Sequence, residues 1–284
     1  MTGETVASIR PGVGNEITRE PLGVIGLITP WNFPIAIPAW KIAPTLAHGN
    51  CVILKPAEIA PGSTWVLSEI LSRCGLPPGV FNLVMGKGRV VGQAMTDHPG
   101  IDAISFTGSV PTGRSIAASP MKKIQLEMGG KNPLMALDDA DLDQAVQVAL
   151  NGALVKTGQR CTASSRLIVT DAIHDRFVAA LGQAMAGLTV GHALDPATQI
   201  GRVADAGQLD TNLRYIGLGQ AQGAHLAYGG ALLNVEPHDA RPLPATRAVH
   251  RHNTRHDHRA RRDFRPPRLR DPGARLSTGV AGCQ

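Results

Sequence analysis

The apolar residues in the first half of the chain form short runs that stop at Gly, Pro or charged residues. Runs of this length are typical of strands that are buried on both faces of a parallel sheet. Between them, amphipathic segments predict helices over 35–47 and 63–74, with Ser63 as the N-cap and Gly75 as the stop of the second helix. Such alternation indicates parallel strands with crossover helices. The predicted strands are 24–28, 51–54, 80–84, 101–106 and a further one that contains Gln125 and Leu126.

The pattern starts again after Pro133. Acidic residues from Asp138 to Asp143 crowd the start of a long predicted helix, where they suit the positive end of the helix dipole. We therefore predict an α/β protein with an open parallel Rossmann-like sheet in residues 1–130 and a second α/β domain in residues 131–234. The elements expected in this second domain are a strand over 134–137, a helix to about Lys156, a strand over 166–169, and helices over 173–188 and 209–222.

Charge is distributed unevenly along the 284 residues. Residues 1–234 contain 17 basic and 17 acidic residues, whereas residues 235–284 contain 11 Arg, no Lys and 5 acidic residues. The net charge of +6 therefore comes from the last segment, which also has five of the ten histidines. A segment so poor in apolar residues cannot bury enough surface to offset the entropy of ordering it, so we predict a disordered basic tail.

Composition excludes several functional classes. No apolar run reaches the ~20 residues that a membrane helix needs, and the first residues lack a basic and an apolar signal region, so a cytoplasmic protein is expected. The four cysteines are widely spaced and predict reduced thiols. No metal site is expected, because the histidines before the tail show no ligand spacing. The tail offers only Phe264 for base stacking, so nucleic-acid binding is a minority interpretation.

Cys161 and Glu127 are the candidate catalytic pair. Cys161 lies among small and polar residues, which suits an exposed turn better than a core. A thiolate attacks carbonyl carbon well, and a carboxylate can take a proton from the water that hydrolyses a thioester. Glu127 lies at the end of a predicted strand and next to Gly129-Gly130, where ligands approach open α/β sheets. A buried structural cysteine and a surface glutamate are the simpler alternatives.

Three further segments follow predicted strands and suit ligand binding. Asn32, between Pro30 and Pro34, is held rigidly enough to donate to an oxyanion, although an asparagine that only stabilises the turn is common. Lys55 and Glu58 can contact a ribose, and a carboxylate there would repel a 2′-phosphate. The glycine-rich segment 86–92, with Gly88, is a poor match to the dinucleotide fingerprint and is expected to be a turn. Segment 106–109 can hold a phosphate at a helix start.

These segments, in their order along the chain, resemble the motifs of the NAD(P)-dependent aldehyde dehydrogenase superfamily. Their amino-acid sequences are most similar to the branch that acts on α-ketoglutaric semialdehyde. The resemblance implies that Cys161 is the nucleophile, that Asn32 and the Cys161 amide hold the oxyanion, and that Glu127 activates the hydrolytic water. It implies NAD or NADP as cofactor, with NAD favoured by Glu58, a small aldehyde as substrate, and a homo-oligomer in the family. The implied cofactor-binding residues are Ile28, Trp31, Lys55, Glu58, Phe106, Gly108 and Ser109, together with Gly88.

The departures from the family pattern define the remaining expectations. Both domains, the cofactor-binding 1–130 and the catalytic 131–234, are expected to be partial, because family members extend further at both ends and oligomerisation segments are missing. The family pattern stops near residue 233, and the Arg-rich segment 235–284 suggests a shifted reading frame. The isolated chain is therefore expected to be an inactive or poorly folded fragment, although its residues encode a dehydrogenase site. The alternatives are a non-catalytic, basic-tailed nucleic-acid binder or pseudogene product, and an esterase that uses only the thiol.

Overall fold

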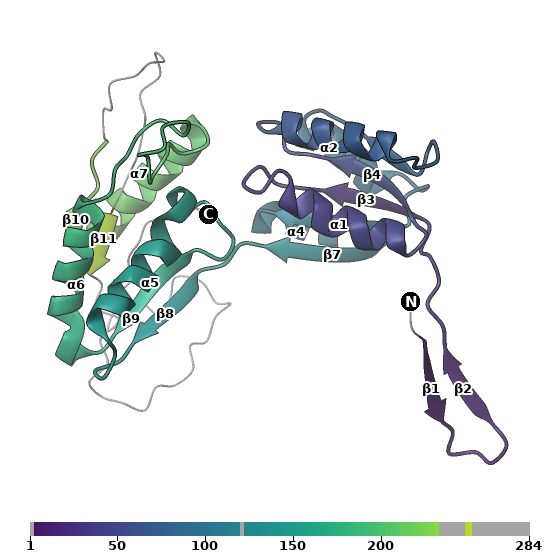
Figure 1. The fold of residues 1–284 in the computed structure, drawn as a ribbon, viewed down its shortest axis with the longest axis horizontal. Helices are drawn as coiled ribbons and strands as arrows, with labels where there is room; N and C mark the ends of the chain where they lie inside the picture. Colours follow the sequence, from purple (N-terminus) through teal and green to yellow (C-terminus); the bar gives the residue numbers. More distant parts are fainter. Residues whose placement is uncertain (1–2, 120–121, 233–247, 252–284) are drawn as a thin grey trace. The chain divides into compact units, whose positions relative to one another are not determined.

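The computed structural model describes residues 3–119, 122–232 and 248–251. Contacts divide the chain into two compact units, Met1–Gly129 and Gly130–Gln284, and each unit is described by itself. Unit 1 contains a five-stranded parallel sheet, and unit 2 contains a parallel strand pair covered by helices (Figure 1). The predicted α/β class is confirmed.

The sheet of unit 1 has the strand order β5-β4-β3-β6-β7, with every neighbouring pair parallel. The chain enters at the central strand, moves outward on one side and then returns to build the other side, which places a topological switch beside β3. The strands are β3 (Val24–Ile28), β4 (Cys51–Lys55), β5 (Phe81–Leu83), β6 (Ala103–Gly108) and β7 (Lys123–Met128).

Helices cover both faces of this sheet. Side chains of β3 alternate, so that Ile25 and Leu27 pack in one apolar cluster with α1 and α2, while Val24 and Ile28 pack in the other with α3 and α4. Burial on both faces explains why these strands read as continuous apolar runs. The helices are α1 (Ala36–Ala47), α2 (Pro61–Arg73), α3 (Gln93–Asp97), which continues a π-helix over Gly88–Gly92, and α4 (Val110–Ala117).

Several boundaries differ from the predicted ones. The helix predicted to begin at Ser63 begins at Pro61, because proline fits the first turn, where no backbone donor is required. It does stop at Gly75, whose φ of +79° is the left-handed C′ conformation. The segment 86–92, expected as a turn, is largely the π-helix. The strand expected to end at Phe106 extends to Gly108.

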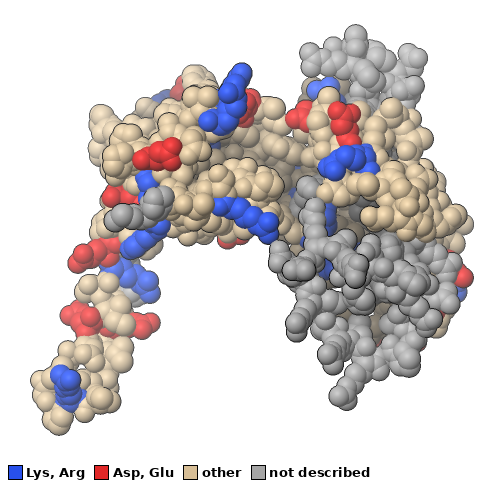
Figure 2. All heavy atoms as spheres, turned by 180° about the vertical axis from the view of Figure 1, so that it is seen from behind, with Lys and Arg blue, Asp and Glu red and all other residues tan. Residues whose placement is uncertain are grey.

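A hairpin that the sequence did not predict precedes the sheet. Strands β1 (Glu4–Ala7) and β2 (Gly14–Ile17) pair antiparallel, and all eight residues are exposed. An isolated two-stranded ribbon is marginal in water. Figure 2 shows basic and acidic side chains interspersed along this hairpin.

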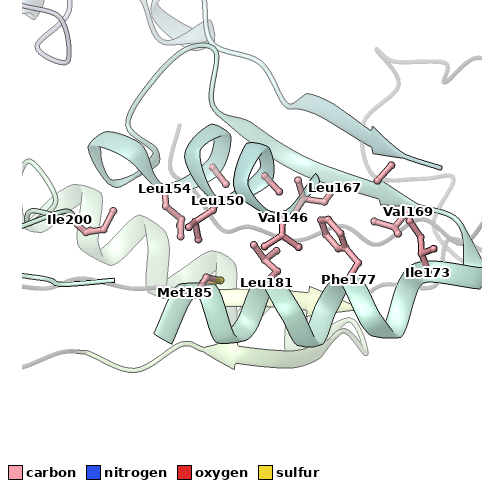
Figure 3. Close-up of a cluster of buried hydrophobic side chains, with 13 residues drawn as sticks. Val146, Leu150, Leu154, Leu167, Val169, Ile173, Phe177, Leu181, Met185 and Ile200 are labelled. Atoms are coloured by element: carbon pink, nitrogen blue, oxygen red, sulfur yellow. The ribbon is translucent and has the colours of Figure 1, made fainter. Parts of the chain in front are cut away.

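Unit 2 packs two helices against a parallel strand pair. Strands β8 (Asn132–Ala136) and β9 (Ser164–Val169) are joined through α5 (Leu142–Leu154), and α6 (Asp171–Ala186) packs on α5. Their apolar side chains form one core, in which Phe177 and Met185 of α6 are at most 1% exposed. Figure 3 shows Phe177, Leu181 and Met185 directed toward Val146, Leu150, Leu154 and Leu167.

The unit ends with α7 (Ala206–Ala221) and β10 (His225–Gly229), which pairs antiparallel with β11 (Ala248–Arg251). Four residues of the segment predicted to be disordered are thus a strand, and the prediction for the rest of 235–284 lies outside the described residues. No helix in the part of the chain that the structure describes is long and apolar enough to cross a bilayer.

Replacing the ring at the centre of the unit 2 core tests this packing. Phe177→Ala removes a side chain that is 1% exposed, so we expect a loss of roughly 3–5 kcal/mol of stability and a lower thermal midpoint. Val148→Ala, on the exposed face of α5 (51% exposed), should change stability by no more than about 0.5 kcal/mol. Equal effects of the two substitutions in thermal unfolding would contradict the assigned core.

Candidate active site

The carboxyl ends of the parallel strands in unit 1 bring the predicted ligand-binding residues to one edge. Ile28 ends β3, Lys55 ends β4 and Gly108 ends β6, while Glu127 is the penultimate residue of β7. The registers align them, because Ile28 pairs with Lys55 on one side and with Phe106 on the other. Ligands of open α/β sheets bind at this edge.

Lys55, Glu58 and Gly88 form one cluster. Lys55 is 4% exposed, and its Nζ donates to the Pro56 carbonyl at 3.0 Å. Burial lowers the pKa of Lys55, and the carboxylate of Glu58 opposes that shift. The Gly88 amide donates to Glu58 Oε1 at 2.5 Å, and a Cβ built on Gly88 would lie 3.8 Å from Lys55 Nζ. The backbone of Gly88 therefore lies directly beside the ends of one cationic and one anionic side chain.

Ser109 caps α4, the helix that follows β6. Its Oγ accepts from the Thr112 amide at 3.4 Å, and Pro111 fits the first turn, so the helix forms despite this proline. A Cβ on Gly108 would lie 2.6 Å from the ring of Phe106. Phe106 is 4% exposed and belongs to the core, so its ring packs beneath this segment and supports it, and its cofactor-binding role stays a prediction.

Trp31 and Asn32 lie half-buried in the turn between β3 and α1. The turn is fixed from two sides. The Thr29 amide donates to the Lys55 carbonyl at 3.1 Å, and the fully buried Thr64 donates from Oγ1 to the Pro34 carbonyl at 3.0 Å. Thr64 thus connects α2 to the turn, a role that sequence reasoning missed. This rigidity is what an amide donor to a developing oxyanion requires.

Lys41 is a second residue that the sequence analysis missed. It lies in α1 and is 9% exposed, and its Nζ donates to Ser105 Oγ at 2.6 Å. The Ser105 hydroxyl donates in turn to Gln125 Oε1 at 2.5 Å. Burial lowers the pKa of Lys41, and the negative charge of Glu127 partly offsets this. The candidate base Glu127 therefore has a buried ammonium as its electrostatic neighbour.

Cys161 of unit 2 is exposed and follows an unusual backbone. Three consecutive residues have left-handed φ values, 56° at Lys156, 60° at Thr157 and 71° at Gly158. Only Gly158 adopts this region without steric cost, and a β-branched residue such as Thr157 is an outlier there. Strain of this kind persists only where surrounding contacts enforce it, and such residues cluster at functional sites.

Side chains on the N-terminal side of the thiol hold this loop. Thr157 Oγ1 donates to the Gly201 carbonyl at 3.1 Å, and Gln159 Oε1 accepts from the Ala204 amide at 2.8 Å. The guanidinium of Arg160 donates to the carbonyls of Asn151 and Gly152 at 2.8 and 2.7 Å. These carbonyls belong to the last turn of α5, where a cation also suits the helix dipole.

The two halves of the predicted site thus lie in different units. Glu127 and the cofactor-binding candidates belong to unit 1, whereas Cys161 belongs to unit 2. The pairing of Cys161 with Glu127 therefore stays a prediction. Within the described ranges, no group of three or more His, Cys, Asp or Glu residues is arranged to hold a metal ion.

Comparisons with known proteins identify the family of this chain. The family model described as "Aldehyde dehydrogenase family" matches residues 1–255. The chain belongs to the aldehyde dehydrogenase family. It is 44% identical over 235 residues to alpha-ketoglutaric semialdehyde dehydrogenase of Bacillus subtilis, covering 82% of this chain and 48% of that protein. It is 43% identical over 231 residues to betaine aldehyde dehydrogenase of the same organism, covering 80% and 47%.

A solved structure shows the same relationship. Betaine aldehyde dehydrogenase of Staphylococcus aureus, in complex with NAD+, superposes with a TM-score of 0.81 at 37% identity, covering 87% of this chain and 50% of that one. The chain therefore spans about half the length of the relatives that it matches.

Relieving the left-handed backbone tests the strain before Cys161. Lys156→Gly should raise the thermal midpoint, because glycine avoids a steric cost of about 1–2 kcal/mol that outweighs its extra unfolded-state entropy. The matched substitution Gln147→Gly, on the exposed side of α5, should lower the midpoint, since glycine costs up to about 1 kcal/mol in a helix. A fall in both variants would refute the strained conformation at Lys156.

The pH dependence of stability tests the burial of Lys41. Its pKa in the folded chain lies below the ordinary value of 10.5, so the unfolded chain binds more protons between these two values, and stability rises with pH across that window. Lys41→Met lacks this contribution. The thermal midpoint of the unmodified chain, relative to that of the variant, should therefore rise as the pH approaches 10.5. Parallel curves would show that the ammonium is not desolvated.

Proposed function

We propose that this chain carries the site of an enzyme that oxidises an aldehyde to a carboxylic acid, with hydride transfer to NAD(P)+. The observation that carries the proposal is the exposed Cys161 on a strained and clamped loop in a member of this family. The cluster at the sheet edge of unit 1 supplies the second requirement, a place for a nucleotide.

The residues at the sheet edge fit a dinucleotide. Lys55 and Glu58 can bind ribose hydroxyls, and the Gly88 backbone lies beside them. Ser109 and the first amides of α4 can hold a phosphate, because the N-terminus of a helix attracts anions. Ile28 and Trp31 line the same edge. When bound, the nicotinamide supplies the hydride acceptor. The carboxylate of Glu58 would repel a 2′-phosphate, so we favour NAD over NADP.

The chain's own residues account for the covalent steps. The Cys161 sulfur bonds to the carbonyl carbon of the aldehyde, and the oxyanion that develops is held by the Asn32 amide and the Cys161 backbone N–H. Loss of hydride from this carbon leaves a thioester on Cys161. Glu127 takes a proton from water, the resulting hydroxide attacks the thioester carbon, and the acid leaves as the thiol is restored.

The substrate that we propose is a semialdehyde. The relative at 44% identity is named for alpha-ketoglutaric semialdehyde. The sequences around Glu127 and Cys161 also resemble those of that branch. Relatives named for betaine aldehyde are nearly as similar, at 43% identity. Rates of nicotinamide reduction measured with both aldehydes therefore discriminate between these two classes of substrate.

A single-turnover experiment tests the function. With NAD+ and α-ketoglutaric semialdehyde, the full chain should form up to one equivalent of reduced nicotinamide and a transient acyl group on Cys161, detected by absorbance and by peptide mass spectrometry. Cys161→Ala should abolish both signals, because the thioester cannot form. Cys74→Ala removes another exposed thiol and should change neither. Reduced nicotinamide formed by Cys161→Ala at the unmodified rate would remove Cys161 from the mechanism.

A further inference from the structure

Asn132 contacts the cysteine loop from the opposite strand. It is the first residue of β8, and its Nδ2 donates to the Cys161 carbonyl at 2.7 Å and to the Ala163 carbonyl at 3.3 Å. The contact follows from the topology. Strands β8 and β9 are parallel and start together, with Asn132 opposite Ser164, so the chain that enters β9 must pass the first side chain of β8. All of these residues belong to unit 2.

The register beside this contact is irregular. Asn132 pairs with Ser164, but Pro133 pairs with Arg166, so Ser165 is an extra residue in β9. Such bulges redirect side chains next to functional sites. On the other side of Asn132, Arg166 Nε donates to the Lys131 carbonyl at 3.0 Å, which fixes the backbone that carries the asparagine. The carboxamide therefore projects from an anchored position.

The two peptide groups that flank the Cys161 Cα are both held. The Arg160 carbonyl accepts from the Ala163 amide at 3.2 Å, and since this peptide is trans and planar, the Cys161 N–H must point in the opposite direction, away from the turn. The following peptide is held by Asn132 through the Cys161 carbonyl. Fixing both planes fixes the direction of the Cys161 N–H and of its Cα–Cβ bond together.

We propose that Asn132 is a positioning residue for the nucleophile. Its carboxamide holds the Cys161 backbone so that the Cys161 thiol and the Cys161 backbone N–H act on the same substrate carbonyl group. The inference rests on the proposed function of Cys161 and adds a residue to it. The proposed role of Asn132 predicts different effects on two kinds of reaction at the Cys161 sulfur. Reactions in which the sulfur attacks a carbonyl and an oxyanion forms need the amide in place, whereas displacement at a saturated carbon needs only the sulfur.

Two reagents on the full chain separate these requirements. With 4-nitrophenyl acetate, the Cys161 thiolate bonds to the acetyl carbon, the carbon–oxygen bond to 4-nitrophenolate breaks, and the acetyl group stays on sulfur. With iodoacetamide, sulfur displaces iodide and no oxyanion forms. The rate at each cysteine is followed by peptide mass spectrometry, with the exposed Cys74 as an internal reference and the half-buried Cys51 as a reporter of unfolding in unit 1.

Asn132→Ala and the isosteric Asn132→Asp both remove the donor. We expect acylation of Cys161 to fall about tenfold in each variant, the effect of losing one well-placed hydrogen bond, while alkylation changes less than about twofold. Asn82→Ala is the matched control, because the Asn82 carboxamide also donates to two backbone carbonyls, those of Val52 and Gly79, in unit 1. It should leave both rates at Cys161 unchanged.

Two outcomes overturn the inference and leave the proposed function intact. These are unchanged acylation in both Asn132 variants, and acylation and alkylation that fall by the same factor, which would make Asn132 only a structural support of the loop. If Cys161 of the unmodified chain is acylated no faster than Cys74, the proposed function itself fails, and the positioning role fails with it.

Discussion

The presentation of Cys161 depends on a backbone conformation that most of its residues do not favour. Lys156, Thr157 and Gly158 are all left-handed, and only the last is glycine. Isolated, this segment would relax, so its geometry requires the polar contacts that Thr157, Gln159 and Arg160 make with the chain around it. The backbone before Cys161 is therefore held by hydrogen bonds rather than by burial, and Cys161 itself stays exposed.

The other half of the candidate site follows from a different constraint, the convergence of parallel strands. Because β3, β4, β6 and β7 run in the same direction, their last residues meet at one edge without any dedicated scaffold. The polar residues there are secured by the layer of helices behind them, as Thr64 of α2 and Lys41 of α1 show. A sheet that is apolar on both faces thus ends in an edge that is charged.

The sequence predicted most of this sheet, because strands buried on both faces leave continuous apolar runs between glycine and proline. It could not predict the β1–β2 hairpin, whose exposed residues show no such run. Lys41 was missed because it is a single lysine in an apolar helix, and its partner Ser105 lies 64 residues away. Likewise, nothing in the types of Lys156 and Thr157 indicates positive φ, since that conformation is imposed by tertiary contacts.

The order of residues around Asn132 has a chemical consequence for the ageing of the protein. An asparagine loses its amide nitrogen spontaneously when the backbone nitrogen of the next residue attacks the side-chain carbonyl, and this ring closure needs a nitrogen that carries hydrogen. Asn132 is followed by Pro133, whose nitrogen has none. The donor to the Cys161 carbonyl is thus shielded from the commonest route of asparagine decay, whereas Asn151, which precedes Gly152, has no such protection.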